Sequence, residues 1–220
     1  MKENLIVAWS GGKDCTLALQ EIQKTEGYSI SALFSSISEE DDRVTMHGIP
    51  RKLLEAQARS LGYPLAVVTI QDRCSEEQYQ TIMQQAMEGW QEHGITGVVF
   101  GDLYLDEIRA YREQNLEQIG LKAIFPLWGR DTYALSHDFI NLGYRAVITC
   151  VDTDQLVGRF AGREYRSDLL DELPQSVDPC GENGEFHTFV YDGPIFSRRV
   201  AFKRGKPHLK QKRFNYYNLE

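Results

Sequence analysis

The stretch LIVAWSGGKD, Leu5–Asp14, decides the fold of this 220-residue chain. Its apolar half predicts a β-strand, and a helical pattern over Thr16–Lys24 begins just after it. A strand that ends in a loop of small residues at a helix N-terminus presents unpaired backbone N–H groups and the positive end of the helix dipole to an anion. The stretch therefore predicts a phosphate-binding site.

Each residue type of the loop suits this chemistry. Gly11 and Gly12 let the backbone approach a ligand without a Cβ in the way, Ser10 offers a hydroxyl, and Lys13, expected to be exposed, supplies a compact positive charge. A carboxylate beside a polyphosphate is useful when it holds a divalent cation, so Asp14 predicts magnesium. The loop is shorter than a Walker A motif or a dinucleotide fingerprint, neither of which occurs here. The alternative is a tight turn in which Ser10 or Asp14 only caps the helix.

Strands and amphipathic helices alternate along the first half of the chain. Further strands are predicted at Ile30–Phe34, Leu65–Ile70 and Gly97–Phe100, and helices from about Pro50, over Ser75–His93 and over Asp106–Ile119. This order, with nearly all-apolar strands, predicts a parallel sheet covered on both faces, which binds ligands at the carboxyl ends of its strands. Gly101 and Asp102 follow one of these strands and are expected at the same edge as the phosphate loop.

The pattern changes in the second half. Helices are predicted near Thr132–Leu142 and over Glu164–Leu173, and strands at Ala146–Cys150, Val200–Phe202 and Phe214–Tyr217. The predicted fold class is therefore α/β, a parallel-sheet domain with a smaller C-terminal α+β domain. We expect the nucleotide domain in residues 1–124 and the smaller domain in residues 125–220.

The composition is typical of a soluble globular protein. No apolar run approaches the roughly 20 residues of a spanning helix and no signal-like segment precedes the first strand, so we expect a cytoplasmic protein without membrane contact. The four cysteines lie apart, which predicts reduced thiols rather than zinc or disulfides. A net charge of −8 disfavours nucleic acid, although Ser197–Arg213 holds eight basic residues and no acidic one. The segment could contact RNA or an acidic protein. Alternatively, its lysines lie on edge strands, where they prevent aggregation.

A second candidate cluster follows the predicted strand Gly97–Phe100. Asp102 stands directly past this buried strand, where carboxylates commonly meet ligands in such folds. Arg109 is a candidate on the next predicted helix. Because Asp106, Arg109 and Glu113 are three and four residues apart, a surface ion-pair ladder is the alternative.

The block DPCGENGEFHT, Asp178–Thr188, is the third candidate site. Its glycines remove steric cover, so Glu182, Glu185 and His187 can reach one ligand together. Three alternatives remain: turn chemistry with solvated charges, a metal site formed by these three side chains, and Cys180 as a nucleophile with His187 as its base.

Together these residues resemble a known family. Ser10–Asp14 after the first strand resembles the signature of the PP-loop ATP pyrophosphatases, which cleave ATP between its α and β phosphates. The later blocks resemble the diphthine–ammonia ligase branch of that superfamily, over nearly the whole chain: Gly101-Asp102, Gly120-Leu121, Pro126–Trp128 and Gly181–Thr188. Two departures from the usual pattern are Cys15, where a serine is common, and Phe186-His187, which leaves room for a different acceptor.

The resemblance implies an ATP-dependent amidation with ATP and Mg²⁺. A carboxylate would attack the α phosphorus, pyrophosphate would leave, and ammonia would displace AMP from the acyl-adenylate. The implied ATP-binding residues are Ser10, Gly11, Gly12, Lys13, Asp14, Gly101 and Asp102, with Asp14 and Asp102 as magnesium ligands. The implied substrate-binding residues are Arg109, Glu182, Asn183, Glu185, His187 and Thr188, and the implied catalytic residues are Lys13, Asp14, Glu185 and His187.

The resemblance also implies the partners. They are ATP, ammonia and a carboxylate acceptor, for which a modified histidine on a translation factor is one candidate, and a homodimer is left open. Two other functions remain as alternatives: RNA modification by a PP-loop enzyme, which would depend on Ser197–Arg213, and a non-catalytic nucleotide-binding module.

Overall fold

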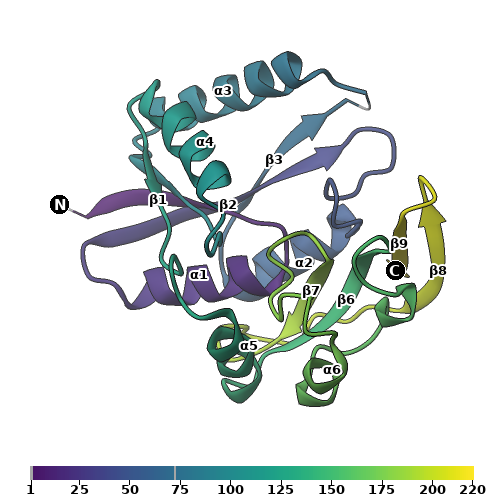
Figure 1. Ribbon diagram of the computed structural model, residues 1–220. Coiled ribbons are helices and arrows are strands. Elements are labelled where there is room, and N and C mark those ends of the chain that lie inside the picture. The colour runs from purple at the N-terminus through teal and green to yellow at the C-terminus, as the bar shows by residue number, and fades with distance from the viewer. Residues whose placement is uncertain (1, 72) are drawn as a thin grey trace.

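The computed structural model describes residues 2–71 and 73–220 (Figure 1). Its first half consists of β1 Glu3–Ala8, α1 Lys13–Lys24, β2 Tyr28–Ser38, α2 Arg51–Leu61, β3 Leu65–Ile70, α3 Glu76–Glu92, β4 Gly97–Val99, α4 Asp106–Glu117 and β5 Lys122–Ile124. These strands form a five-stranded parallel sheet in the order β3-β2-β1-β4-β5. The sheet confirms the predicted α/β fold class.

The sheet order creates a binding crevice. The chain runs from β1 outward through β2 and β3, then crosses back so that β4 pairs with the other side of β1. Loops leave β1 and β4 toward opposite faces at such a switch point, which opens a crevice at the carboxyl ends of the strands. Helices α3 and α4 cover one face, and α1 and α2 cover the other (Figure 1).

The second half adds an antiparallel sheet. Its elements are α5 Thr132–Asn141, β6 Arg145–Asp152, the 3₁₀ turn η1 Gly158–Phe160, α6 Ser167–Glu172, β7 Phe186–Asp192, β8 Arg204–Lys210 and β9 Phe214–Leu219. The strands follow the order β7-β6-β9-β8. Helix α1 lies between this sheet and the parallel one (Figure 1).

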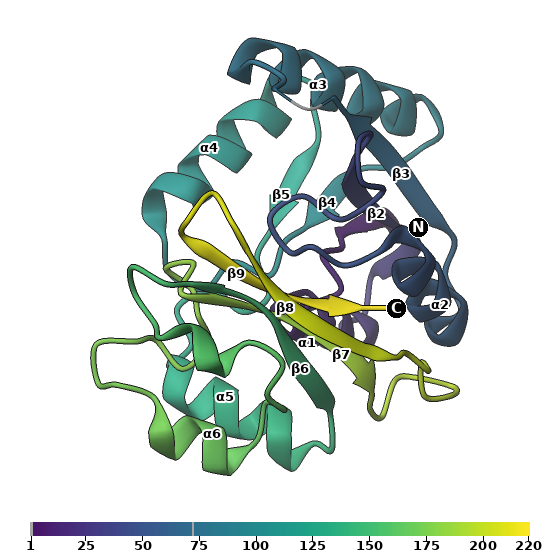
Figure 2. The same cartoon turned by 90° about the vertical axis from the view of Figure 1, so that its right-hand side faces the viewer.

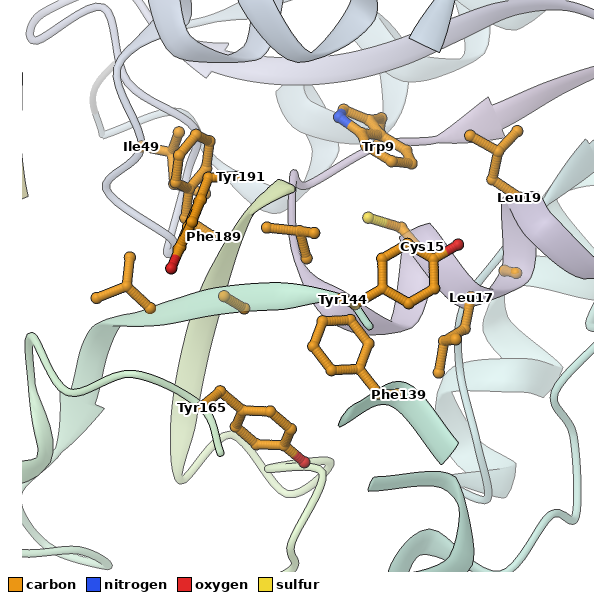
Figure 3. Close-up of a cluster of buried hydrophobic side chains, with 14 of the residues drawn as sticks. Trp9, Cys15, Leu17, Leu19, Ile49, Phe139, Tyr144, Tyr165, Phe189 and Tyr191 are labelled. Atoms are coloured by element: carbon orange, nitrogen blue, oxygen red, sulfur yellow. The ribbon is translucent and has the colours of Figure 1, made fainter. Parts of the chain in front are cut away.

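One hydrophobic core joins the two halves. Phe139 and Tyr144 from the second half face Cys15 and Leu17 of α1, and Tyr165 packs against Phe139 with ring centroids 5.6 Å apart (Figure 3). Burying an apolar side chain of this size stabilises a fold by about 1.5–3 kcal/mol. The antiparallel sheet is therefore held firmly against the helix that begins at the phosphate loop.

Four sequence expectations need correction. Val200–Phe202 is not a strand, and β8 begins only at Arg204. Val200 is buried, and the hydrogen bond from its backbone N–H to the Tyr191 carbonyl holds a segment that crosses the sheet without joining it. The predicted helix over 164–173 is shorter, because Glu164 forms a β-bridge with Val147. The short strand β5 was not expected, and His187 lies within β7 rather than in a turn.

The basic segment lies partly on the edge of the second sheet. Strand β8 is the outer strand and is exposed along most of its length. Lys210 pairs with Asp41 at 3.6 Å, and Arg213 pairs with Asp152 at 2.6 Å. Within residues 2–71 and 73–220, no helix has both the length and the apolar character needed to cross a membrane.

Candidate active site

A cavity of about 450 Å³ lies at the carboxyl ends of β1, β2 and β4. Its polar end contains Ser10, Lys13, Asp14, Asp102 and Glu182. Its other end, between the sheet and helices α3 and α4, is largely apolar. The apolar side chains there are Phe34, Met83, Met87, Phe100, Leu116 and Ile119, and the polar ones from the two helices are Gln80, Gln84, Arg112, Asn115 and Gln118. The cavity thus has a charged end and a largely apolar end, which suits a ligand that joins phosphates to a flat aromatic base.

The phosphate loop opens α1 without a side-chain cap. Gly12 is the N-cap residue, and no side chain caps the helix from this position. Ser10 Oγ accepts the Gly12 N–H at 3.3 Å, and Thr188 Oγ1 accepts the Lys13 N–H at 3.1 Å. Ser10 and Asp14 therefore do not serve as the N-cap that the alternative interpretation required.

Lys13 is a buried cation and not the exposed loop lysine that the sequence suggested. Only 2% of the residue is exposed. Its Nζ donates to both carboxylate oxygens of Asp14, at 2.8 and 2.9 Å, and to the Cys180 carbonyl. Burial opposes the charged ammonium, but the negative charge of Asp14 and Glu182 outweighs it and raises the pKa of Lys13. The polar end of the cavity therefore keeps a fixed positive charge.

The two expected magnesium ligands have different surroundings. The Asp14 side chain is 29% exposed at the cavity, whereas that of Asp102 is 13% exposed and lies 2.9 Å from Arg112 Nε. Mg²⁺ is commonly held by one or two carboxylates together with substrate phosphates and water. Within residues 2–71 and 73–220, no group of three or more His, Cys, Asp and Glu side chains could hold a metal. The donors present fit a magnesium ion that arrives with a nucleotide and binds Asp14.

Glu182 connects the C-terminal block to the parallel sheet. Its Oε1 accepts the backbone N–H of Leu103, just past β4, at 2.7 Å. Burial, together with the charges of Asp14 and Asp102, raises the pKa of Glu182 to about 7. This carboxyl group lines the cavity and can change protonation state near neutral pH.

Glu185 and Asn183 lie behind the cavity wall. Glu185 is 1% exposed, and its Oε1 accepts the Asp178 N–H at 2.9 Å and the Asn183 amide at 3.0 Å. Asn183 Oδ1 accepts the Tyr104 hydroxyl at 3.1 Å. These bonds brace the block 178–185, so the carboxylate in this block that faces the cavity is Glu182.

His187 forms a ring pair with a residue that the sequence did not single out. Its imidazole packs against that of His47, with ring centroids 4.1 Å apart and the ring planes tilted by 34°. Burial, followed by the neighbouring charges, lowers the pKa of His187 well below its usual value, and it lowers the pKa of His47 to about 4. Both rings are therefore neutral at physiological pH.

Other expectations for the C-terminal block also change. Glu185 lies away from Glu182 and His187, so these three do not form a common metal site. The Cys180 thiol is 2% exposed and faces the Thr132 carbonyl at 3.4 Å. Burial raises its pKa well above the usual value, so it is not a thiolate.

Arg109 does not line the cavity. Its Nε donates to Glu113 at 2.8 Å, and its guanidinium lies 4.7 Å from the ring centre of Trp128, which matches one half of the ion-pair ladder. The arginine that lines the cavity is Arg112, which stacks on Phe100 at 4.3 Å. Since the two arginines are three residues apart on α4, sequence spacing alone could not tell which one reaches the cavity.

Comparison with known proteins covers both halves of the molecule. Residues 2–123 match the family described as diphthamide synthase N-terminal domain, and residues 131–219 match the one described as diphthamide synthase C-terminal domain. The chain is 28% identical to a diphthine–ammonia ligase of Danio rerio over 216 residues, which cover 87% of this chain and 83% of that protein. It is 25% identical to that of Rattus norvegicus over 87% of this chain and 80% of that protein. The human protein of the same name is 24% identical, over 87% of this chain and 79% of that protein.

Proposed function

Because this chain belongs to the diphthamide synthase family, we propose that it is an ATP-dependent ligase that forms a carbon–nitrogen bond between a carboxylate and ammonia. One observation carries the proposal: the buried cation Lys13 and the N-terminus of α1 lie at one end of a cavity whose other end is largely apolar. The relatives named diphthine–ammonia ligase support a diphthine side chain as the acceptor.

ATP fits this cavity in one direction. Its triphosphate lies against the N–H groups of the loop and the Lys13 ammonium, because a helix N-terminus and a lysine both attract phosphate. Its adenine enters the apolar end, near Phe34 and Phe100. Asp14 would hold a magnesium ion that arrives with the nucleotide, and such an ion would supply positive charge beside the departing pyrophosphate.

The reaction then takes two steps. The acceptor carboxylate attacks the α phosphorus, the α–β phosphoanhydride bond breaks, and Lys13 with the loop N–H groups stabilises the leaving pyrophosphate. Ammonia next attacks the acyl carbon of the adenylate, and AMP leaves with the electron pair of the broken C–O bond. Glu182, whose pKa is about 7, accepts the proton that the new amide nitrogen loses.

The first test is the identity of the products. We expect one AMP and one pyrophosphate for each amide formed, because the loop and Lys13 hold the part of the triphosphate that leaves. Anion-exchange chromatography of the nucleotides, with mass spectrometry of the acceptor, measures all three products. Release of ADP and inorganic phosphate would contradict the proposal, and binding of ATP without any turnover would favour a non-catalytic module.

A second test concerns the nitrogen source. We expect free ammonia to support turnover and glutamine to fail, because no cysteine offers a reactive thiolate in the cavity. Cys15, Cys150 and Cys180 are buried, each with a raised pKa. Cys74 donates its thiol to the Ser75 carbonyl at 3.4 Å and does not line the cavity. Amide formation is measured with ¹⁵N-ammonium or amide-¹⁵N-glutamine after ammonium has been removed. Incorporation of glutamine nitrogen at a comparable rate would refute this expectation.

The acceptor enters the cavity through a neighbouring groove. A groove of about 1160 Å³ adjoins the cavity and shares Val44, Thr45, Met46, Tyr79 and His187 with it. Its outer walls are the loop between β2 and α2 and the β8–β9 hairpin, which lie beside each other in Figure 2. An acceptor in this groove reaches the phosphates past His187 without displacing the adenine.

A charge reversal tests this route. Lys210 lines the groove, whereas Lys206 lies on the same exposed strand outside it. We expect Lys210→Glu to raise KM for a diphthine-bearing translation factor by about tenfold through lost charge complementarity, and to leave KM for ATP unchanged. Steady-state kinetics with Lys206→Glu as the control measures the difference. Equal effects of the two substitutions would place the acceptor elsewhere.

A further inference from the structure

The side chain of Gln57 joins three distant parts of the molecule. It lies on α2 and is 0% exposed. Its Nε2 donates to the Gly11 carbonyl at 3.0 Å and to the Val190 carbonyl at 2.5 Å, and its Oε1 accepts the Trp9 indole N–H at 3.0 Å. The amide thus uses both of its N–H groups and its oxygen to tie the end of β1, the phosphate loop and β7 together.

These bonds set the direction of one peptide unit in the loop. The Gly11 carbonyl accepts a second hydrogen bond from the Val190 N–H at 2.9 Å, so two donors hold it. In a trans peptide unit the C=O and the following N–H point in opposite directions. Holding the Gly11 oxygen toward Gln57 therefore turns the Gly12 N–H away from it, to the side of the Ser10 hydroxyl, which accepts this N–H at 3.3 Å. Both Ser10 and Gly12 line the cavity.

The space around Gly11 supports this reading. Gly11 has φ of +81°, in the left-handed region that favours glycine. A Cβ at this position would lie 2.7 Å from Gln57 Oε1 and 2.8 Å from Leu54 Cδ2. The loop therefore passes so close to Gln57 that the position of the amide and the backbone conformation of Gly11 depend on each other.

We propose that Gln57 is a positioning residue for the phosphate loop: it holds the Gly11–Gly12 peptide so that the Gly12 N–H and the Ser10 hydroxyl that accepts it lie on the side of the leaving pyrophosphate. This inference rests on the proposed ATP-dependent function. Gln57 itself does not line the cavity, so it acts only through the loop.

The test compares two buried positions on the same helix. Gln57→Leu keeps the size of the side chain and removes its hydrogen bonds. The matched control is Ser60→Ala, because Ser60 is buried one turn further along α2 and also ties it to the C-terminal half, through the Arg198 carbonyl at 2.5 Å. Calorimetric titration with Mg·ATP, pyrophosphate and adenosine is carried out at a temperature at which all the proteins are folded.

We expect Gln57→Leu to weaken the binding of Mg·ATP and pyrophosphate at least tenfold and the binding of adenosine less than twofold, with Ser60→Ala close to the original protein for all three. Equal weakening for all three ligands, or no weakening, would overturn the inference. If Gln57→Leu does not fold, Gln57→Met is measured instead. If neither folds while Ser60→Ala does, the inference fails, because Gln57 would then serve the fold. An original protein that does not bind Mg·ATP counts against the proposed function instead.

Discussion

Replacing Lys13 with methionine is expected to lower kcat/KM by about 10²–10³-fold, the usual cost of removing one group that stabilises transition-state charge. Lys13 is buried beside the N-terminus of α1, where no water can substitute fully for its ammonium. Methionine keeps much of the length of the lysine side chain, so the loss isolates the charge. Turnover is measured as pyrophosphate release under saturating ammonia.

The same substitution should also destabilise the protein. Breaking a fully buried ion pair costs about 3–5 kcal/mol. The cost here should be lower, because the Asp14 side chain is 29% exposed and gains water in place of Lys13. Lys24→Met is the control, since Lys24 ends the same helix in an exposed pair with Glu21. If the Lys13→Met enzyme kept more than a tenth of the original kcat/KM, Lys13 would not be a group that stabilises the transition state.

Glu182→Gln is expected to lower the rate of amide formation by about 10²–10⁴-fold, as for a lost general base. The carboxyl must be deprotonated to accept a proton, so the original rate should rise with pH through about 7, the pKa of Glu182. The glutamine variant should lack this rise. Rates are compared at a fixed concentration of free ammonia, so that the titration of ammonium does not contribute. An unchanged pH profile in the variant would assign the base to another group.

The stability of the protein without nucleotide offers an independent check on Glu182. Its pKa is raised from 4.5 to about 7, so the folded state holds the proton more tightly than the unfolded chain does. The resulting stabilisation is fully present below pH 4.5 and is lost as the pH rises through about 7. Tm of the original protein relative to Glu182→Gln should therefore fall across this range. Both proteins share the buried His47 and His187, so their difference isolates Glu182.

The parallel sheet was predictable because its signals are local. The run Leu5–Asp14 contains both the strand and the loop, and the alternation of apolar strands with amphipathic helices requires only neighbouring residues. The family resemblance is confirmed by the matches over both halves of the chain. The prediction of a strand at Val200–Phe202 was wrong because apolar residues also occur where an extended segment crosses a core without joining a sheet.

The composition of the site was harder to predict because it depends on distant contacts. Nothing near Lys13 in the sequence indicates that the Cys180 carbonyl accepts a hydrogen bond from its ammonium. Nothing near His187 indicates that the His47 ring packs against it. Glu182 and Glu185 are the same type of residue and lie in one glycine-rich block, yet one lines the cavity and the other braces the block. Their different roles arise from the packing of the C-terminal half against the parallel sheet.

The contacts between the phosphate loop and β7 also determine when, during synthesis, the loop can take its final form. A ribosome makes the loop long before its partners: Thr188, which accepts the Lys13 N–H, lies 175 residues later in the chain, and Cys180 lies 167 residues later. Contacts between such distant residues cannot form before the later residue has been made, and closing so long a stretch of chain is slow. A nascent or truncated chain that ends before β7 lacks Thr188 and Val190, which bond to the backbone of the loop. The loop is therefore expected to reach its final form late in the synthesis and folding of the protein.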